Sequence, residues 1–275
     1  MQKKASTTQL CRVLGISRSG WYAAKARTQQ PARLCPAEVQ LCASFTQSGQ
    51  TYGSRRLSQA VKAQGWPVGR HKARRLMRKH GLQARSKRKF RHTTDSRHNL
   101  PIADNLLDRQ FIPKAKNQAW VSDITYIRTG SGWLYLAVVL DLYSRKVVGW
   151  AMAAHMPAAL VCKALQMALN IRRPPPGLLV HSDRGSQYAS AEHRQLLAEH
   201  QCIASMSRKG NCWDNAVMER FFLSLKLERV WQCQYANHLE AQQDIAHYIV
   251  GFYNTERLHS TLGYLSPTDF EKADL

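Results

Sequence analysis

The sequence predicts an α/β protein in which a mixed β-sheet is flanked by helices and preceded by a small, all-helical basic region. Beyond about residue 117, three runs rich in β-branched and aromatic residues follow one another across short turns. Helix-length and strand-length segments then alternate, as expected for a sheet with helices on its faces. Residues 1–100 hold 22 Lys and Arg against two acids, whereas residues 101–275 hold 18 against 16. The chain therefore divides into a basic front and a nearly neutral body.

The first thirty residues (1–30) predict a helical hairpin. Thr7 or Thr8 is suited to cap a first short helix, Gly15 interrupts it, and Ser17 begins a second helix. A second helix that carries arginines after a glycine turn is one way of presenting a helix to DNA, although any two-helix hairpin shares the pattern.

A second helical unit is predicted over residues 31–83, with a small core that includes Leu57, Val61, Leu76 and Met77. Its last helix, at 70–81, is crowded with basic residues and has no acids nearby to pair with them. We expect this helix to face phosphates or a DNA groove. The basic residues are Arg70, Lys72, Arg74, Arg75, Arg78 and Lys79.

Residues 84–112 predict a basic linker. The stretch 84–99 is polar and short of apolar residues, so we expect it to become ordered on DNA. Lys87, Arg88 and Lys89 are candidate DNA contacts within it. The formal net charge of +22 supports binding to phosphates, and a solvated basic surface without a ligand is the alternative.

Residues 113–275 form the body and its helical tail. Three strands are expected first, as an antiparallel meander, at 119–129, 133–144 and 146–154. The order that follows is helix, strand, helix, strand and helix, at 157–171, 178–183, 190–200, 202–207 and 214–231. A further helix is expected at 239–253.

Three acids interrupt these apolar segments. Asp123 lies within the first strand, Asp183 ends the fourth, and Glu219 falls inside the helix that begins near Asp214, with 35 residues between it and Asp183. An ionised carboxylate removed from water costs several kcal/mol unless it is paired or bound to metal. Together the three would repel one another unless hard divalent cations, Mg²⁺ or Mn²⁺, supplied the opposing charge. Two such ions about 3.5–4 Å apart can act on a phosphodiester.

Other polar residues near these acids have alternative explanations. A turn-capping role competes with metal binding at Asp183. A turn or a partnership with Arg145 explains Asp141, a helix cap explains Asp214, and solvent or a salt bridge explains Glu228. His181 is expected to be packed or to face the substrate, and Lys226 is expected either to reach a phosphate or to be an exposed surface lysine.

The seven cysteines form no CxxC pair, which indicates neither a disulfide framework nor a zinc ribbon. A zinc site from Cys35, Cys42, His71 and His80 is a weak alternative, because its spacing matches no familiar finger. The sequence contains no 18-residue apolar run and no secretory segment. A cytoplasmic, nucleoid-associated protein is therefore expected.

Five motifs, in order, resemble insertion-sequence transposases of the DDE retroviral-integrase superfamily, of the type encoded by the second of two overlapping reading frames. They are WVSDITYI, GWLYLAVVLDLYSRKVVGW, HSDRGSQYAS, SRKGNCWDNAVMERFF and YNTERLHSTLGYLSP. The segment YGSRRL…RHKARRLMRKHGL resembles the helix-turn-helix module that precedes the integrase core in those proteins. The zinc-bound module that begins retroviral integrases has no matching spacing here.

The resemblance implies a ribonuclease-H-like, five-stranded integrase core at 113–275, after a helix-turn-helix DNA-binding domain at 31–83. It implies that Asp123, Asp183 and Glu219 hold two Mg²⁺ or Mn²⁺ ions and that one site both cuts and joins DNA. The expected substrates are the element's terminal inverted repeats and a target duplex, with Lys226 matching a basic residue that contacts the end DNA. A homo-oligomer and a product of the upstream frame, separate or fused, are the expected protein partners.

Two other functions are compatible with these residues. A ribonuclease-H-like nuclease or resolvase would cut DNA without joining it. A DNA-binding regulator would use the basic helices and would not need the three acids for catalysis.

Overall fold

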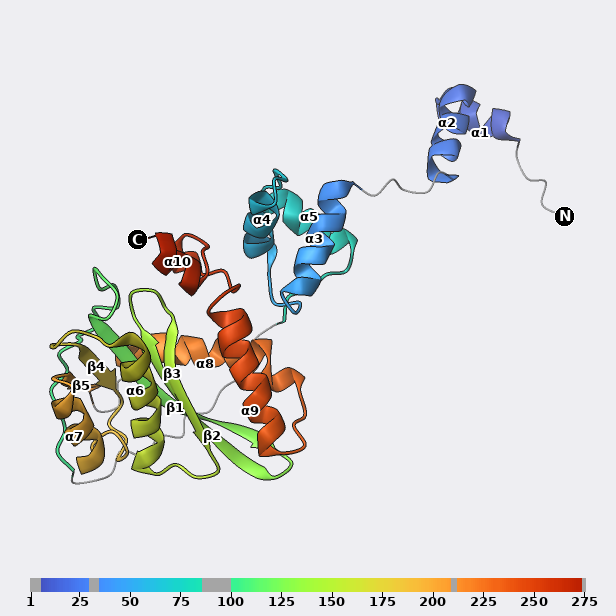
Figure 1. Ribbon diagram of the computed structural model, residues 1–275. Helices are drawn as coiled ribbons and strands as arrows, with labels where there is room; N and C mark the ends of the chain where they lie inside the picture. The colour runs from blue at the N-terminus through green and yellow to red at the C-terminus, as the bar shows by residue number, and fades with distance from the viewer. Residues whose placement is uncertain (1–5, 30–34, 86–99, 209–211, 274–275) are drawn as a thin grey trace.

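The computed structural model describes residues 6–29, 35–85, 100–208 and 212–273. A hairpin of α1 (Thr7–Val13) and α2 (Arg18–Gln29) comes first along the chain. A three-helix unit follows, and the α/β body completes the molecule (Figure 1). The three-helix unit consists of α3 (Pro36–Gln47), α4 (Ser54–Ala63) and α5 (Arg70–Lys79). Its core contains Leu57, Val61, Leu76 and Met77, as predicted.

The body contains one five-stranded mixed sheet with strand order β3-β2-β1-β4-β5. The strands are β1 (Ala119–Thr129), β2 (Gly132–Asp141), β3 (Val147–Ala153), β4 (Leu179–Ser182) and β5 (Ile203–Met206). The first three form the predicted antiparallel meander, whereas β4 pairs in parallel with both β1 and β5. The fold class predicted from the sequence is confirmed.

Helices cover both faces of the sheet (Figure 1). On one face, α6 (Ala158–Arg172) and α7 (Ala191–Glu199) enclose a core built around Trp120, Leu165 and Val180. Gly149 of β3 lets α6 approach closely, because a Cβ there would lie 2.3 Å from the carbonyl oxygen of Ala164. On the other face, α8 (Ala216–Glu228) and α9 (His238–His247) cover Val121, Leu136 and Val138.

Two predicted helices are interrupted in the structure. The segment expected at 214–231 consists of a 3₁₀ turn (Cys212–Asn215), α8 and a second 3₁₀ turn (Val230–Gln232). The helix expected at 239–253 continues from α9 as a π-helical turn (Tyr248–Tyr253). A short 3₁₀ turn (Ser260–Leu262) and α10 (Pro267–Ala273) follow. Within the described part of the chain, no helix combines the length and apolar character needed to cross a membrane.

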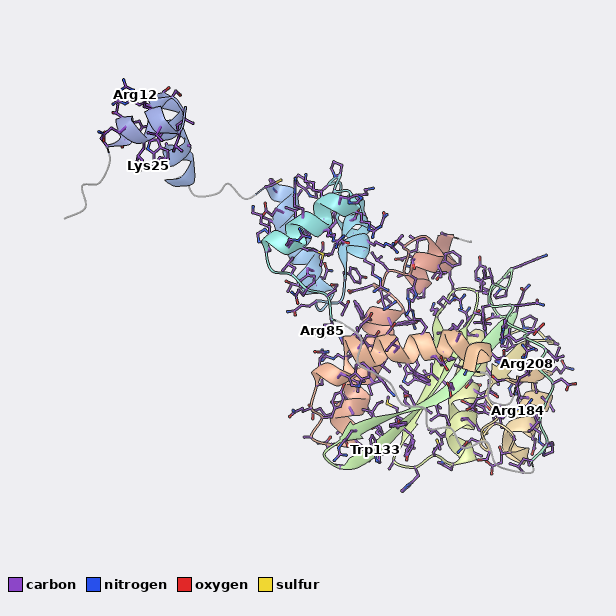
Figure 2. All side chains as sticks on the ribbon, turned by 180° about the vertical axis from the view of Figure 1, so that it is seen from behind. Arg12, Lys25, Arg85, Trp133, Arg184 and Arg208 are labelled. Carbon is purple, nitrogen blue, oxygen red and sulfur yellow. The ribbon has the colours of Figure 1, made fainter. Side chains whose placement is uncertain are left out.

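The three-helix unit docks on the body through hydrogen bonds that join distant parts of the chain. The Tyr52 hydroxyl donates to the Glu256 carbonyl at 3.2 Å and accepts the Leu258 N–H at 2.9 Å. Arg85, at the junction in Figure 2, donates to the Glu228 carbonyl at 2.9 Å. The Glu228 carboxylate is itself buried, and Arg257 holds it at 2.7 Å. Of the two predictions for Glu228, the salt bridge is confirmed and solvent exposure is wrong.

Two further local assignments made from the sequence can be compared with the structure. Ser6, rather than Thr7 or Thr8, caps α1, in a reciprocal capping box with Gln9, so that assignment is wrong. Of the two explanations for Asp141, the turn is confirmed, because Asp141 accepts the Tyr143 N–H at 3.0 Å, and the pair with Arg145 is wrong. Asp141 also accepts the Asn117 N–H and an Nη2–H of Arg172 at 3.1 Å. The reason is topological, because α6 brings Arg172 to the end of β2.

Arg172 also binds Glu271 at 2.7 Å and so ties the C-terminal helix to the sheet. Replacing Arg172 by Met would leave the carboxylates of Asp141 and Glu271 buried without their main cation. We expect Arg172→Met to lower the free energy of unfolding by about 3–5 kcal/mol. Urea unfolding provides the measurement. Lys163→Met, at an exposed position of the same helix, should change stability by less than about 0.5 kcal/mol. Equal losses in both variants would contradict a structural role for the ion network.

Candidate active site and DNA-binding surfaces

The parallel register between β1 and β4 places Asp123 next to Asp183. Val121 pairs with His181, an offset of 60 residues, and the same offset aligns Asp123 with Asp183. Both aspartates lie just beyond the last paired residues, where β4 has ended and β1 continues against β2 alone. Neighbouring strands lie about 4.8 Å apart. Asp183 thus lies just beyond the carboxyl end of β4, where α/β proteins usually bind ligands, and Asp123 lies beside it within β1.

Glu219 reaches this region from the first turn of α8, which packs against β1. The start of α8 is anchored by Asp214, which is fully buried. Asp214 accepts an N–H from Arg109 at 2.9 Å and from both the backbone and the side chain of Arg208. Arg109 and Arg208 hold the pKa of Asp214 well below its usual value, against the opposing effect of burial. The predicted helix-cap role is therefore wrong: the N-cap of α8 is Asn215, and Asp214 anchors the preceding turn.

The charges of the three acids act on one another. Burial raises the pKa of Asp123 strongly, and the negative charges of Asp183 and Glu219 raise it further. A hydrogen bond from the Ile124 N–H and the charge of Lys226 act in the opposite direction. Asp183 also accepts the Gly185 N–H at 2.9 Å, which is the turn contact expected as its alternative role. Burial and the two like charges together favour the neutral form of Asp123.

Among the described residues, no three His, Cys, Asp or Glu side chains are close enough to form a ready-made metal cage. The weak alternative of a zinc site from Cys35, Cys42, His71 and His80 is likewise not formed, and His80 contacts Glu38 instead. The acids are thus brought to one region by the fold without being drawn into contact. Their oxygens are nevertheless the donor type that Mg²⁺ and Mn²⁺ prefer, and a divalent cation would offset their repulsion.

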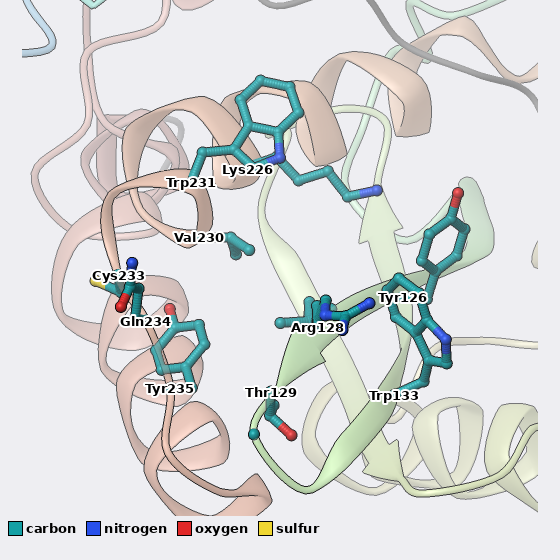
Figure 3. Close-up of a pocket in the computed structure, with 12 residues that line it drawn as sticks. Tyr126, Arg128, Thr129, Trp133, Lys226, Val230, Trp231, Cys233, Gln234 and Tyr235 are labelled. Carbon is teal, nitrogen blue, oxygen red and sulfur yellow. The ribbon is translucent and has the colours of Figure 1, made fainter.

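Lys226 lies two helical turns beyond Glu219 and is buried, so the expectation of an exposed surface lysine is wrong. Its Nζ lies 4.8 Å from the centre of the Tyr126 ring. Burial lowers the pKa of Lys226 to about 8, with Asp123 acting in the opposite direction. Figure 3 shows this side chain extending from α8 toward Tyr126, inside a groove of about 690 Å³.

The groove has one wall from the β1–β2 hairpin and one from the chain after α8 (Figure 3). Tyr126 and Trp133 meet edge to face with their ring centres 5.2 Å apart, and the Arg128 guanidinium lies over the Trp133 ring. Trp231 and Tyr235 line the opposite wall. Sequence reasoning did not select these aromatic residues. The strand positions of Tyr126 and Trp133 resembled ordinary sheet packing, and only the partial exposure of Trp133 sets it apart.

The basic residues of α5 project from the unit's core. Ala73, Leu76 and Met77 are buried, and all six predicted DNA-contacting side chains of this helix are exposed. Lys79 also binds Glu38 at 2.7 Å. Lys87, Arg88 and Lys89 lie outside the described residues. His181 is packed rather than available to a substrate, because it is buried between the hydroxyls of Ser205 and Ser207.

Comparison with known proteins agrees with this architecture. Family models described as "Integrase core domain" match residues 113–212 and 200–267, and one described as "HTH-like domain" matches residues 39–90. Transposase InsF for insertion sequence IS3A of Escherichia coli (strain K12) is 44% identical over 280 residues, covering 100% of this chain and 96% of the relative. An uncharacterized 31 kDa protein of insertion element IS600 from Shigella sonnei is 44% identical over 268 residues, covering 96% and 97%.

A solved structure shares the fold. The simian T-cell lymphotropic virus intasome, in complex with PP2A regulatory subunit B56 gamma, contains a chain that aligns with a TM-score of 0.50 and 16% identity. The alignment covers 86% of this chain and 74% of the viral one. Fold and matches together define a transposase with a ribonuclease-H-like integrase core, an enzyme of the polynucleotidyl transferase type. Within this class the chain belongs to the IS3 family of InsF transposases.

Charge repulsion at the acidic site predicts a gain in stability when one acid is neutralised. Without divalent cations, Asp123→Asn should raise the free energy of unfolding by on the order of 1–2 kcal/mol at neutral pH, because it removes a half-buried, repelled carboxylate. Urea unfolding in the presence of a chelator tests this. Asp104→Asn, at an exposed acid, is the matched control and should have little effect. A destabilised Asp123→Asn protein would rule out repulsion as the dominant effect.

Proposed function

We propose that Asp123, Asp183 and Glu219 form the metal-dependent active site at which this transposase cuts the ends of its element and joins them to target DNA. The observation that carries the proposal is the β1–β4 register, which aligns Asp123, within β1, with Asp183, just beyond the end of β4. The effect of Glu219 on the pKa of Asp123 supports Glu219 as the third acid of the site. We propose two Mg²⁺ or Mn²⁺ ions per site, which when bound would activate the attacking oxygen and stabilise the leaving one.

The protein's own groups have distinct roles in this proposal. The sheet fixes Asp123 and Asp183, and the anchored start of α8 supplies Glu219. Lys226 on the same helix would hold a phosphate of the transposon end beside the acids. The groove next to Lys226, with its aromatic walls, suits a DNA strand, because bases stack on aromatic rings irrespective of sequence.

We further propose that the chain is organised in four functional segments. Residues 1–30 form a helical hairpin, 31–83 bind DNA, 84–112 are a basic linker, and 113–275 catalyse. Arg70, Lys72, Arg74, Arg75, Arg78 and Lys79 would contact DNA, together with Lys87, Arg88 and Lys89. The enzyme would act in the cytoplasm on nucleoid DNA, as a homo-oligomer that pairs two ends, with an upstream-frame product as a partner or fusion.

Substitution of the acids tests the catalytic assignment. Asp123→Asn, Asp183→Asn and Glu219→Gln should each reduce end cleavage and the joining of pre-cleaved ends by at least about 10²–10³-fold, because each removes charge that acts on the transition state. DNA binding should be largely kept. Cleavage and joining are measured on labelled end duplexes with Mg²⁺, and Asp104→Asn is the control. Wild-type activity in any of the three variants would remove that residue from the site, whereas cleavage without joining by the wild-type protein would favour a nuclease.

A second test concerns the basic helix α5. Replacing Arg74, Arg75 and Arg78 by Ala should weaken DNA binding and reduce the slope of log K against log salt by up to about three, because fewer phosphates are neutralised. Fluorescence anisotropy over a salt series provides the slope. The exposed residues Lys114, Lys163 and Arg194, replaced together by Ala, make a charge-matched control. An unchanged slope in the α5 variant would exclude this helix from phosphate contact.

A further inference from the structure

A second cavity, of about 440 Å³, lies where the three-helix unit meets the catalytic body. It is lined by four arginines: Arg56 of α4, Arg145 between β2 and β3, Arg220 of α8, and Arg257 of the C-terminal segment. We call it the arginine cavity. No Asp or Glu is among the residues that line it, so its described walls carry only positive formal charge.

Nearby acids neutralise only part of this charge. Glu228, behind the cavity, binds Arg257 at 2.7 Å and lies 3.7 Å from Arg56. One carboxylate is thus shared between two guanidinium groups. In the described part of the chain, no acid forms an ion pair with Arg145 or Arg220. The charge of Asp141 acts on Arg145 without an ion pair. The cavity therefore keeps more positive charge than its described ion pairs neutralise.

Arg145 supplies an independent sign that an acceptor is missing. Its Nη2 donates to the Phe111 carbonyl at 2.8 Å, but its Nη1 is buried without a hydrogen-bond partner in the described structure. A buried donor left without an acceptor costs about 1–3 kcal/mol. An anion in the cavity would offer the oxygen that this donor lacks.

The remaining lining groups also suit an oxygen-rich anion. Ala216 and Val217, in the first turn of α8, line the cavity, and the N-terminus of a helix favours negative charge. The hydroxyl residues Ser260 and Thr261 line another side. His259 is held neutral, because burial lowers its pKa to about 2 with further lowering by Arg257, Arg56 and Arg145. Three of the four arginines thus act electrostatically on the His259 side chain.

We propose that the arginine cavity binds a backbone phosphate of DNA at the seam between the DNA-binding unit and the catalytic core. DNA is favoured over a free phosphate because the cavity joins Arg56, from the unit with the basic helix, to Arg220, the residue after Glu219. A duplex contacting both parts would cross this seam, and the phosphate would hold the two parts together. The inference rests on the proposed function in one respect, that DNA is the substrate.

The test compares DNA binding by Arg145→Gln, Arg220→Gln and the double variant with binding by the wild type, in the absence of divalent metal so that no cutting occurs. Arg194→Gln, at an exposed arginine on α7, is the matched control. The double variant should reduce the slope of log K against log salt by about 0.9, the value for one phosphate. Arg220 is exposed, so its single variant should fold even where replacement of Arg145 does not.

A phosphate scan identifies the contact. Duplexes that each carry one neutral methylphosphonate are compared between the wild type and the Arg220→Gln variant. A methylphosphonate at one position should weaken binding by the wild type. The same duplex should cause no further loss in the variant, because the guanidinium that contacts this phosphate is already absent. An unchanged salt slope, or equal sensitivity of both proteins at every position, would overturn the proposal.

A parallel measurement separates DNA from free phosphate. Inorganic phosphate is added to the DNA-free protein, and thermal unfolding is recorded for the wild type and Arg145→Gln. If inorganic phosphate stabilises the wild type but not Arg145→Gln, and the salt slopes of DNA binding are unchanged in the variants, the cavity binds a free anion and the DNA assignment is overturned. Absence of salt-dependent DNA binding by the wild type would instead contradict the proposed function itself. A steep salt dependence of wild-type DNA binding, with the same slope in the variants, would contradict only the proposed role of the arginine cavity.

Discussion

Parallel pairing of β4 with β1 sets the arrangement of the three acids. It aligns Asp123, within β1, with Asp183, beyond the end of β4, and leaves Asp123 half-buried near the charges of Asp183 and Glu219. Burial and like charge both oppose ionisation, so the sheet maintains an arrangement that costs stability in the absence of cations. Such a cost is typical of sites selected for chemistry rather than for stability. The surrounding ion networks serve to keep this arrangement in place.

Those networks fix the elements that carry the site. Asp214 is buried between Arg109 and Arg208 and sets where α8 begins, and thereby where Glu219 stands. At the other end of α8, Glu228 binds Arg257 and lies near Arg56 of the three-helix unit. The helix that carries Glu219 is thus held at both ends by charge pairs with distant segments. A change at either end would alter the position of this helix and, with it, the proposed active site.

Helix α8 also lies between the three-helix unit and the proposed active site. On one side of α8, Lys226 projects into an aromatic groove (Figure 3), and on another, Arg220 lines the arginine cavity. Phosphate contacts mostly fix the position and register of a protein on DNA. In our proposal, contacts on several sides of α8 would orient a duplex so that a chosen phosphodiester meets the three acids.

Local patterns in the sequence predicted the fold class, which the structure confirms, and selected Asp123, Asp183 and Glu219, whose catalytic role stays a prediction. An aspartate within a strand and a basic helix without neighbouring acids are local patterns that folding stability rarely explains. Such patterns therefore indicate function. Partners that lie far apart in the chain became evident only from the folded structure. Asp214 precedes a helix and therefore resembles a cap, yet its cations come from Arg109 and Arg208. The burial of Lys226 and the meeting of Arg56, Arg145, Arg220 and Arg257 were likewise undetermined by local pattern. Periodicity reports which way a residue faces on its own element, whereas the neighbour it meets depends on how distant elements pack.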